Sequence, residues 1–372
     1  MTNLDISRIL IVGACARAAA QSAHQAGYQV FAADLFADTD TQLVANCKTL
    51  SDYPYDIPLA VEHFQPDAVC ITGALENHPS LLEKISQRTL LLTPPISAIA
   101  FVRSPRQLSS FLHSHGLDFP EVIESHAPQD GRWLAKPFKS GSGHQIKLVP
   151  AGSTCPADCY LQRYIEGCSM SISYLLQPET TTVLGTSELL PPPLYSQMPF
   201  QFQGAVTNTL PPQHIIELER LGDLLRKQGI LGLVGIDFIL TADDKLVILE
   251  VNPRYTATME LYRDRWESPL MAYHIEAFIN PNRPTSKDIE YPLAGKRILY
   301  ARQKITISEK LLNHIQQMAT VENVSLSDLP RVGTTIHNEH PILTIHAVGK
   351  DTGLLKEKLN NFATRLLDGT KL

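Results

Sequence analysis

The chain has 372 residues, of which 44% are hydrophobic and 19% are charged, and these values indicate a globular protein of two or three domains rather than a disordered one. Its net charge of −6 excludes the overall positive field that attracts nucleic acid or an anionic membrane surface. No apolar stretch is long enough for a membrane-spanning helix, and the first residues do not have the pattern of a signal peptide, so we expect a cytoplasmic protein.

The first hundred residues are predicted to form a parallel sheet with covering helices. The first two of four short apolar runs flank an alanine-rich helical pattern, which is the arrangement of a βαβ unit. The runs lie at 8–12, 29–33, 68–72 and 89–92. Gly13 is not followed by the other glycines of the G-x-G-x-x-G pattern that brings a backbone against a dinucleotide. We therefore predict a Rossmann-like domain that packs on the catalytic part or adds to its acceptor pocket, and no NAD or FAD site.

A lysine inside an apolar strand, followed by a glycine-rich loop, predicts a phosphate site. The strand WLAKPF at 133–138 carries Lys136, and the loop KSGSGH at 139–144 follows at once. Glycines allow a loop backbone to close over phosphate groups, and a neighbouring ammonium supplies positive charge. The alternative is a surface hairpin whose lysine extends to solvent.

A proline-rich segment at 189–204 interrupts the strand pattern before an amphipathic helix at 212–228. Long loops inside compact domains are often lids or binding loops, so we expect this segment to help select the substrate. The expected selectivity residues come from this loop and from the stretch after residue 254, and they are Tyr195, Phe202, Gln203, Tyr255, Glu260 and Arg263.

Two apolar runs within 236–251 flank a polar break and predict a β-hairpin. If the aspartates at 243–244 form its turn, Asp237 faces Glu250, and alternation puts Asn252 on the same face as Glu250. Two carboxylates this close require a cation between them, and Mg²⁺ prefers oxygen ligands of this kind. The alternatives are a hairpin edge with solvated charges, or a register that is shifted by one residue.

The stretch after the hairpin, 256–278, is predicted to be helical, and NPNRPTS at 280–286 has the composition of a linker. A small mixed domain should follow, with strands at 296–300 and 342–348 and a helix at 350–367. It contains His337, His340 and His346, for which we expect hydrogen-bonded or solvated positions rather than a metal site.

The order of these parts resembles the ATP-grasp superfamily, which includes biotin carboxylase, carbamoyl phosphate synthetase and D-alanine:D-alanine ligase. The motifs that carry the resemblance lie between residues 103 and 278, and they are WLAKPF with KSGSGH, YLQRYIEG, and GIDFIL with ILEVNPR. The resemblance implies an α/β fold with three domains. These are a Rossmann-like domain at 1–98, an ATP-grasp catalytic domain at 99–280 and a small mixed α+β domain at 290–372.

The resemblance also implies roles for individual residues. Lys136 resembles the lysine that holds the ATP phosphates, and the loop that closes over them corresponds to Ser140, Gly141, Ser142 and Gly143. The hinge that reads adenine corresponds to Gln162, Tyr164 and Ile165, and the magnesium ligands to Asp237, Glu250 and Asn252. Arg254 resembles the arginine that stabilises the transferring phosphoryl group and the acyl phosphate.

Two positions depart from the superfamily pattern. Gly167 is followed by Cys168 and Ser169, so the acidic residue that often holds the ribose has no counterpart. The first ATP lysine is replaced by an arginine, either Arg103 or Arg106, and we assign Arg106 to this position.

A narrower resemblance covers nearly the whole chain. The runs ARAAAQSAHQAGYQVFAADLFADTD, EVNPRYTATMELY and DLPRVGTTIHNEHPILTIHAVG are similar to an uncharacterised ATP-grasp family of methylotrophic and related bacteria. Members of that family are associated with tetrahydromethanopterin- and methanofuran-linked one-carbon metabolism. The resemblance implies that glutamate is added to a cofactor of this kind, although no residue identifies the acid or the amine.

The activity implied by both resemblances is an ATP-dependent carboxylate–amine ligase that releases ADP and phosphate and uses Mg²⁺ or Mn²⁺. Its expected partners are ATP, a small carboxylate, a small amine and a second copy of the chain, because related ligases are often dimers. The alternatives are a carboxylase-type enzyme that forms carboxyphosphate from bicarbonate, and a sensor that binds Mg-ATP without turning it over.

Overall fold

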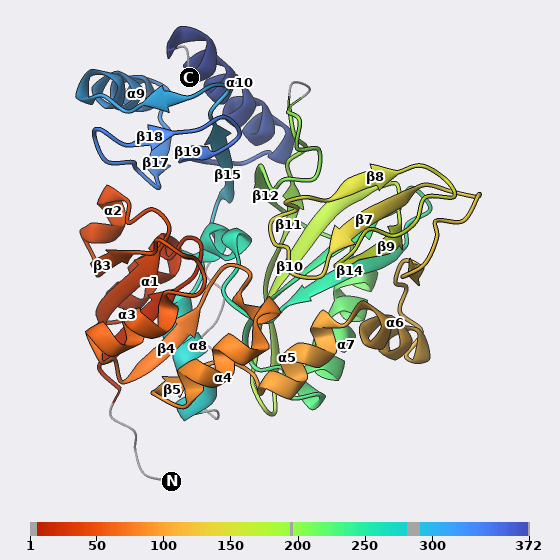
Figure 1. Cartoon of the computed structure of the whole chain (residues 1–372). Helices are drawn as coiled ribbons and strands as arrows, with labels where there is room; N and C mark the ends of the chain where they lie inside the picture. The colour runs from red at the N-terminus through yellow and green to blue at the C-terminus, as the bar shows by residue number, and fades with distance from the viewer. Residues whose placement is uncertain (1–5, 194–195, 281–290, 371–372) are drawn as a thin grey trace.

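The computed structural model describes residues 6–193, 196–280 and 291–370, and it has three parts in chain order (Figure 1). The N-terminal part is a parallel sheet in the order β3-β2-β1-β4-β5. Its strands are β1 (Arg8–Val12), β2 (Gln29–Asp34), β3 (Asn46–Thr49), β4 (Ala68–Ile71) and β5 (Leu90–Leu91). Its helices are α1 (Arg17–Gln25), α2 (Thr39–Gln42), α3 (Ile57–Phe64), the 3₁₀ turn η1 (Leu75–Asn77) and α4 (Pro79–Ser86). This confirms the predicted α/β class, although the sequence pattern missed β3, whose residues are mostly polar.

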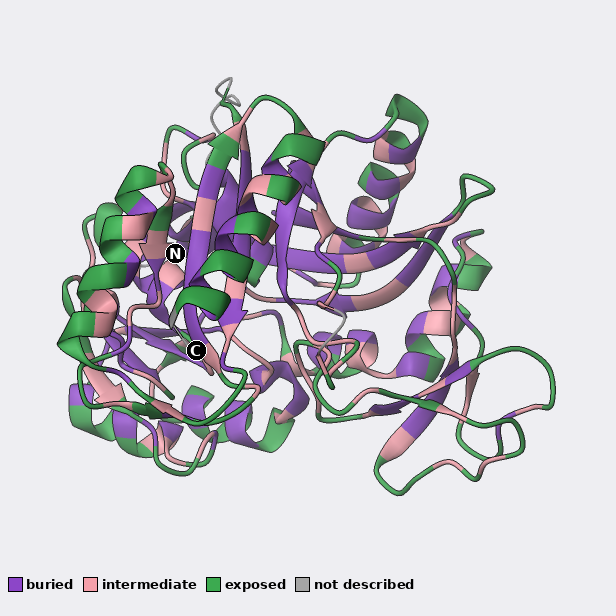
Figure 2. Ribbon diagram, turned by 90° about the horizontal axis from the view of Figure 1, so that it is seen from above, coloured by how far each residue is buried: buried purple, intermediate pink, exposed green. Residues whose placement is uncertain are grey.

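The apolar character of β1 follows from its position at the centre of this sheet. Its last four side chains are fully buried, because helices pack on both faces of the sheet. Figure 2 shows the same contrast over the whole molecule, with buried residues along the strands and exposed residues on the outer sides of the helices. Gly13 ends the strand at a point where the chain approaches β4 closely. A Cβ on Gly13 would lie 2.1 Å from Thr72 Oγ1, so the packing of two strand ends requires this glycine.

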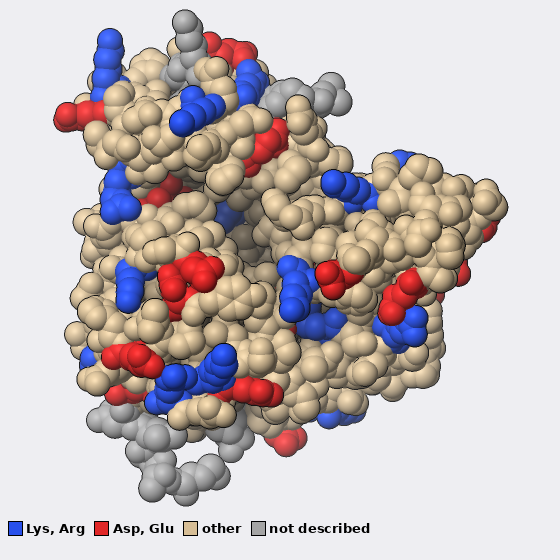
Figure 3. Space-filling view, viewed as in Figure 1, with Lys and Arg blue, Asp and Glu red and all other residues tan. Residues whose placement is uncertain are grey.

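The central part contains two sheets that follow the helices α5 (Ile96–Arg103) and α6 (Pro105–Ser114). The smaller sheet has the order β6-β9-β7-β8, and its strands are β6 (Val122–Ile123), β7 (Trp133–Pro137), β8 (Lys147–Val149) and β9 (Cys159–Arg163). The larger sheet begins with β10 (Cys168–Leu176), β11 (Thr181–Leu189), β12 (Gly204–Asn208), β13 (Gly232–Leu240) and β14 (Leu246–Asn252), and it is covered by α7 (Pro212–Lys227). The two sheets face the N-terminal part across a surface hollow (Figure 3).

The C-terminal part continues the larger sheet instead of forming a sheet of its own. Its strands β15 (Leu293–Tyr300), β17 (Ser325–Ser327) and β19 (Pro341–Gly349) extend the order to β14-β13-β10-β11-β12-β15-β19-β17. A short pair, β16 (Ile305–Thr306) and β18 (Thr335–Ile336), and the helices α9 (Glu309–Val321) and α10 (Thr352–Thr370) complete it. The pattern predicted β15, β19 and α10 within a few residues, but it missed α9 and the join between β12 and β15.

The predicted single helix after the hairpin is wrong. The stretch forms the 3₁₀ turn η2 (Ala257–Tyr262) and a separate helix α8 (Leu270–Ile279). Pro269 stands just before α8 with an extended backbone, and the residue before a proline is disfavoured in a helix, so the two elements cannot join. No helix in the described ranges is both long and apolar enough to span a membrane.

His274 of α8 connects the central sheet to the end of the N-terminal sheet. Its Nδ1 accepts from Leu233 N at 3.0 Å, and its Nε2 donates to Leu92 O at 3.1 Å. Burial lowers the pKa of His274 from 6.5 to about 4, so the ring is neutral at neutral pH.

Acidification is expected to destabilise the protein through His274. Between pH 6.5 and pH 4 the unfolded state binds a proton that the folded ring does not, so the free energy of unfolding decreases as the pH falls. The loss amounts to about 3 kcal/mol for this ring. His274→Gln can keep both hydrogen bonds without titrating, so its urea unfolding midpoint should fall less between pH 6.5 and pH 4.5. Identical pH dependence in the two proteins would contradict this assignment.

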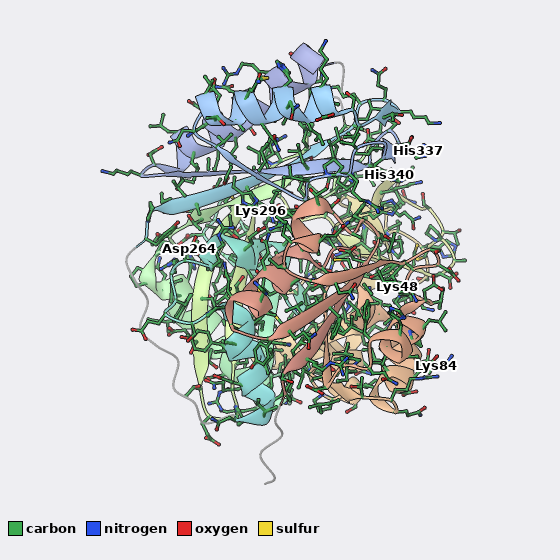
Figure 4. The ribbon with its side chains drawn as sticks, turned by 90° about the vertical axis from the view of Figure 1, so that its left-hand side faces the viewer. Lys48, Lys84, Asp264, Lys296, His337 and His340 are labelled. Carbon is green, nitrogen blue, oxygen red and sulfur yellow. The ribbon has the colours of Figure 1, made fainter. Side chains whose placement is uncertain are left out.

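A buried ionic network joins the three parts, and we call it the junction network. Arg17 of α1 donates to Glu260 of η2 at 2.9 Å and to Asp328 at 2.6 Å. Lys296 of β15 lies 2.6 Å from the same Glu260 carboxylate, and Figure 4 places it where the C-terminal part meets the other two. Arg17, Glu260 and Lys296 are each less than 5% exposed. Each part therefore supplies charges that another part neutralises.

Candidate active site

The predicted hairpin is formed by β13 and β14, and Asp237 lies opposite Glu250 as predicted. The turn is longer than the two residues predicted, because Leu240 pairs with Leu246. A regular ladder from that turn would place Asp237 opposite Leu249. Instead, Leu249 forms a one-residue bulge that shifts the register back. The bulge is what puts the two carboxylates on one face of the hairpin.

The three predicted metal ligands converge at the base of this hairpin. Asn252 Nδ2 lies 3.4 Å from Asp237 Oδ2 and 3.3 Å from Glu250 Oε1. The Glu250 side chain is 32% exposed, so the group is accessible from outside the protein. Two carboxylates are ligands that a divalent cation such as Mg²⁺ accepts, while the Asn252 amide turns its nitrogen to them and its oxygen to Arg254. The residues present therefore fit a metal ion.

The surroundings of this group shift the pKa values of its two carboxylates in opposite directions. Burial, reinforced by the neighbouring Glu250, raises the pKa of Asp237 to about 7. Burial also opposes ionisation of Glu250, but Arg103 and Lys136 outweigh it and lower the pKa of Glu250 to about 2. Arg103 lies 3.6 Å from the Glu250 carboxylate. The two cations act mainly on Glu250, whereas burial and the neighbouring Glu250 oppose ionisation of Asp237, so a metal ion would supply the positive charge that Asp237 lacks.

Lys136 lies on β7 and is 8% exposed. Its Nζ donates to Gln162 Oε1 on the neighbouring strand β9 at 3.1 Å and lies 5.9 Å from the centre of the Tyr160 ring. Gln162 Nε2 is buried and has no hydrogen-bond partner among the described residues. A buried ammonium beside an unsatisfied amide donor is an arrangement that a polar ligand completes.

The glycine-rich loop packs closely against the predicted selectivity loop. Ser142 O accepts from Phe202 N at 3.0 Å. A Cβ on Gly143 would lie 1.6 Å from Phe200 O, and the φ angle of Gly143 is +73°. Both observations require glycine at this position, so the loop conformation depends on the sequence GSG that predicted it.

Arg254 is held from both sides of its guanidinium. Nε lies 2.9 Å from each carboxylate oxygen of Glu76, which is buried in the N-terminal part. One terminal nitrogen donates to Tyr255 O at 3.3 Å and the other to Asn252 Oδ1 at 3.4 Å. An arginine has five N–H donors, so one N–H on each terminal nitrogen remains for an anion.

The structure does not bring all the predicted residues to this group. Arg106 is 66% exposed and pairs with Glu124 at 2.8 Å, whereas Arg103, the alternative for the same role, contacts Glu250. Tyr164 and Ile165 directly follow β9, and the Arg132 guanidinium lies 4.3 Å from the centre of the Tyr164 ring.

The predicted selectivity residues differ in burial and do not form one group. Glu260 belongs to the junction network, and Gln203 and Tyr255 are buried, while Phe202 and Arg263 are more accessible. Tyr195 lies outside the described residues.

Two residues of the site escaped the sequence analysis, namely Glu76 and Asn77. They lie just beyond β4, at the carboxyl edge of the parallel sheet, where ligands of open α/β sheets usually bind. Their position directly after a parallel strand is the one signal in the sequence that could have identified them.

Comparison with known proteins supports this description of the fold. Residues 104–258 match a protein family described as ATP-grasp domain. A search of curated proteins finds no match. N5-carboxyaminoimidazole synthetase from Staphylococcus aureus, solved with ADP, superposes with a TM-score of 0.72 at 14% identity, and the match covers 98% of this chain and 99% of that one.

Two other solved structures are similar over most of their length. The L-amino acid ligase from Bacillus licheniformis has a TM-score of 0.69 at 14% identity, with 97% and 98% of the two chains covered. The biotin carboxylase domain of 2-oxoglutarate carboxylase from Hydrogenobacter thermophilus, solved with MgADP and bicarbonate, has a TM-score of 0.69 at 11% identity, with 93% and 87% covered. The chain therefore has the fold of ATP-grasp ligases.

Proposed function

We propose that this chain is an ATP-dependent ligase that activates a substrate carboxylate as an acyl phosphate and joins it to an amine. The observation that carries the proposal is the convergence of Asp237, Glu250 and Asn252 with the cations Lys136, Arg103 and Arg254. A site that only bound a nucleotide would have little need of an arginine with two donors free for an anion. The ATP-grasp fold adds support.

In the first step, an oxygen of the substrate carboxylate attacks the γ-phosphorus of ATP. The bond from that phosphorus to the bridging oxygen breaks, so an acyl phosphate and ADP form. Lys136 neutralises phosphate charge, and Arg254 directs its two remaining N–H groups at the transferring phosphoryl group. Asp237, Glu250 and Asn252 would hold Mg²⁺ or Mn²⁺, which supplies further positive charge to the phosphates.

In the second step, the amine attacks the acyl carbon, the carbon–oxygen bond to phosphate breaks, and the amine loses a proton. A free carboxylate would have to expel oxide, whereas the acyl phosphate expels phosphate, which is a much better leaving group. The protein contributes mainly the alignment of the two reactants. By its narrower resemblance, the favoured reaction is glutamate addition in one-carbon cofactor biosynthesis.

A second candidate is a carboxylase-type reaction in which bicarbonate takes the place of the organic acid and carboxyphosphate forms. The structural similarity to a biotin carboxylase domain that was solved with bicarbonate favours this candidate.

Release of ADP by the purified protein, measured with Mg-ATP and pairs of carboxylic acids and amines, tests the proposal. Glutamate and bicarbonate belong in the panel. One acid and one amine that stimulate ADP release only together would establish the ligase, and stimulation by bicarbonate without an organic acid would establish the second candidate. Formation of AMP in place of ADP would contradict both.

A further inference from the structure

One short segment carries the N-terminal part into the candidate active site. Leu75, the first residue of η1, is fully buried and anchors the turn. The next two residues, Glu76 and Asn77, are also buried, but their side chains bond residues of the other parts of the chain. These side-chain contacts of Glu76 and Asn77 do not take part in the pairing of the parallel strands.

Glu76 determines the orientation of the arginine proposed to bind the phosphoryl group. Both its carboxylate oxygens lie 2.9 Å from Arg254 Nε, and its side chain is 1% exposed. Because Glu76 accepts only from Nε, each terminal nitrogen of Arg254 still has one N–H that no protein group uses among the described residues. A charged pair shielded from water in this way keeps its geometry better than an exposed pair does.

Asn77 connects two other groups of the same site. Its Oδ1 accepts from Arg103 Nε at 2.9 Å, and its Nδ2 donates to Ser140 O in the glycine-rich loop at 2.9 Å. Arg103 in turn lies 3.6 Å from Glu250. The amide orientation is unambiguous, because the reversed amide would oppose a donor to a donor and an acceptor to an acceptor.

Close packing links the same segment to the glycine-rich loop independently of these bonds. A Cβ on Gly141 would lie 2.7 Å from Ala74 Cβ, which directly precedes η1. The loop can take this position only because residue 141 has no side chain.

We propose that Glu76 and Asn77 are positioning residues for phosphoryl transfer: Glu76 orients Arg254, and Asn77 orients Arg103 and holds the glycine-rich loop. The chemistry assigned to them rests on the proposed function, whereas their effects on loop exchange and phosphate binding can be measured without turnover. The N-terminal part then completes the catalytic centre.

Three variants test this inference. Glu76→Gln keeps the size of the side chain but removes the charge that holds Arg254. Asn77→Asp keeps the acceptor for Arg103 but places a carboxylate oxygen against Ser140 O, which should release the loop. Ser80→Ala, at an exposed position three residues on, is the matched control.

For Asn77→Asp, hydrogen–deuterium exchange of the peptide 139–146 should become about tenfold faster in the nucleotide-free protein, because one restraint on the loop is lost. For Glu76→Gln, inorganic phosphate should bind the MgADP complex about fivefold more tightly, because Arg254 has lost its counter-charge. With the substrates that stimulate the wild type, the kcat of Glu76→Gln should nevertheless fall about tenfold or more.

Tighter binding of a product together with slower turnover cannot arise from a general loss of stability, so this combination identifies positioning. Unchanged loop exchange in Asn77→Asp would overturn its role in holding the loop, and unchanged phosphate affinity in Glu76→Gln would overturn the role of Glu76. If Ser80→Ala changed loop exchange and phosphate affinity as much as the other two variants, the roles of both Glu76 and Asn77 would be overturned. If no substrate pair stimulates the wild type, the proposed function fails, while exchange and phosphate binding still decide this inference.

Discussion

Replacing Glu250 by glutamine should lower the rate of substrate-stimulated ADP release by about 10³-fold while the protein stays folded. The amide has nearly the same size, but it removes one of the two negative charges available to a metal ion. It also takes away the counter-charge that Arg103 and Lys136 share. The measurement is the rate of ADP release at saturating ATP over a series of Mg²⁺ concentrations, with circular dichroism to verify folding.

Asp243→Asn is the matched control for this experiment. Asp243 lies at the exposed tip of the same hairpin and forms an ion pair with Lys245 at 2.8 Å. The charge change is identical, so the rate should match that of the wild type. A Glu250→Gln rate within about tenfold of the wild type would exclude Glu250 as a metal ligand.

Replacing Glu260 by alanine should destabilise the protein by about 3 to 5 kcal/mol, because it leaves buried charges without a partner. Arg17 would retain Asp328, but Lys296 would lose the only carboxylate with which it forms an ion pair in the described structure. The expected observation is a much lower midpoint in thermal or urea unfolding. The contacts between the three parts should be lost first, at the lowest temperatures or urea concentrations of the transition.

Glu267→Ala provides the comparison, since Glu267 lies in the same stretch and is exposed. Its effect should stay within about 0.5 kcal/mol. If Glu260→Ala costs less than about 1 kcal/mol, water must reach Arg17 and Lys296 in the variant, and the junction network does not hold the parts together.

The sequence could predict the hairpin and the grouping of Asp237, Glu250 and Asn252 at its base, because alternation along a strand is a local property. The register came out correctly only because two deviations cancelled. The turn is longer than two residues, and the bulge at Leu249 restores the pairing of Asp237 with Glu250. Neither deviation can be recognised from the local sequence. The turn consists mostly of ordinary polar residues, and the bulged residue is a leucine, which is common in regular strands.

Contacts between distant segments could not be predicted. Arg103 and Arg106 lie one turn apart in sequence, and only the packing of α5 against the central sheet decides which of them meets Glu250. The bond from Glu76 to Arg254 spans 178 residues. The pairing of β12 with β15 likewise depends on the whole sheet, so the local sequence pattern predicts a separate C-terminal domain and not a continuation of the larger sheet.

The pairing of β12 with β15 also has a consequence for synthesis on the ribosome. β12 ends at Asn208 and its partner begins at Leu293, so a growing chain displays the open edge of β12 until the later strand has left the ribosome. An unpaired strand edge is a template for pairing with other chains. Nascent chains that stop between these two strands should therefore need chaperones most, and truncation within that interval should give an insoluble product.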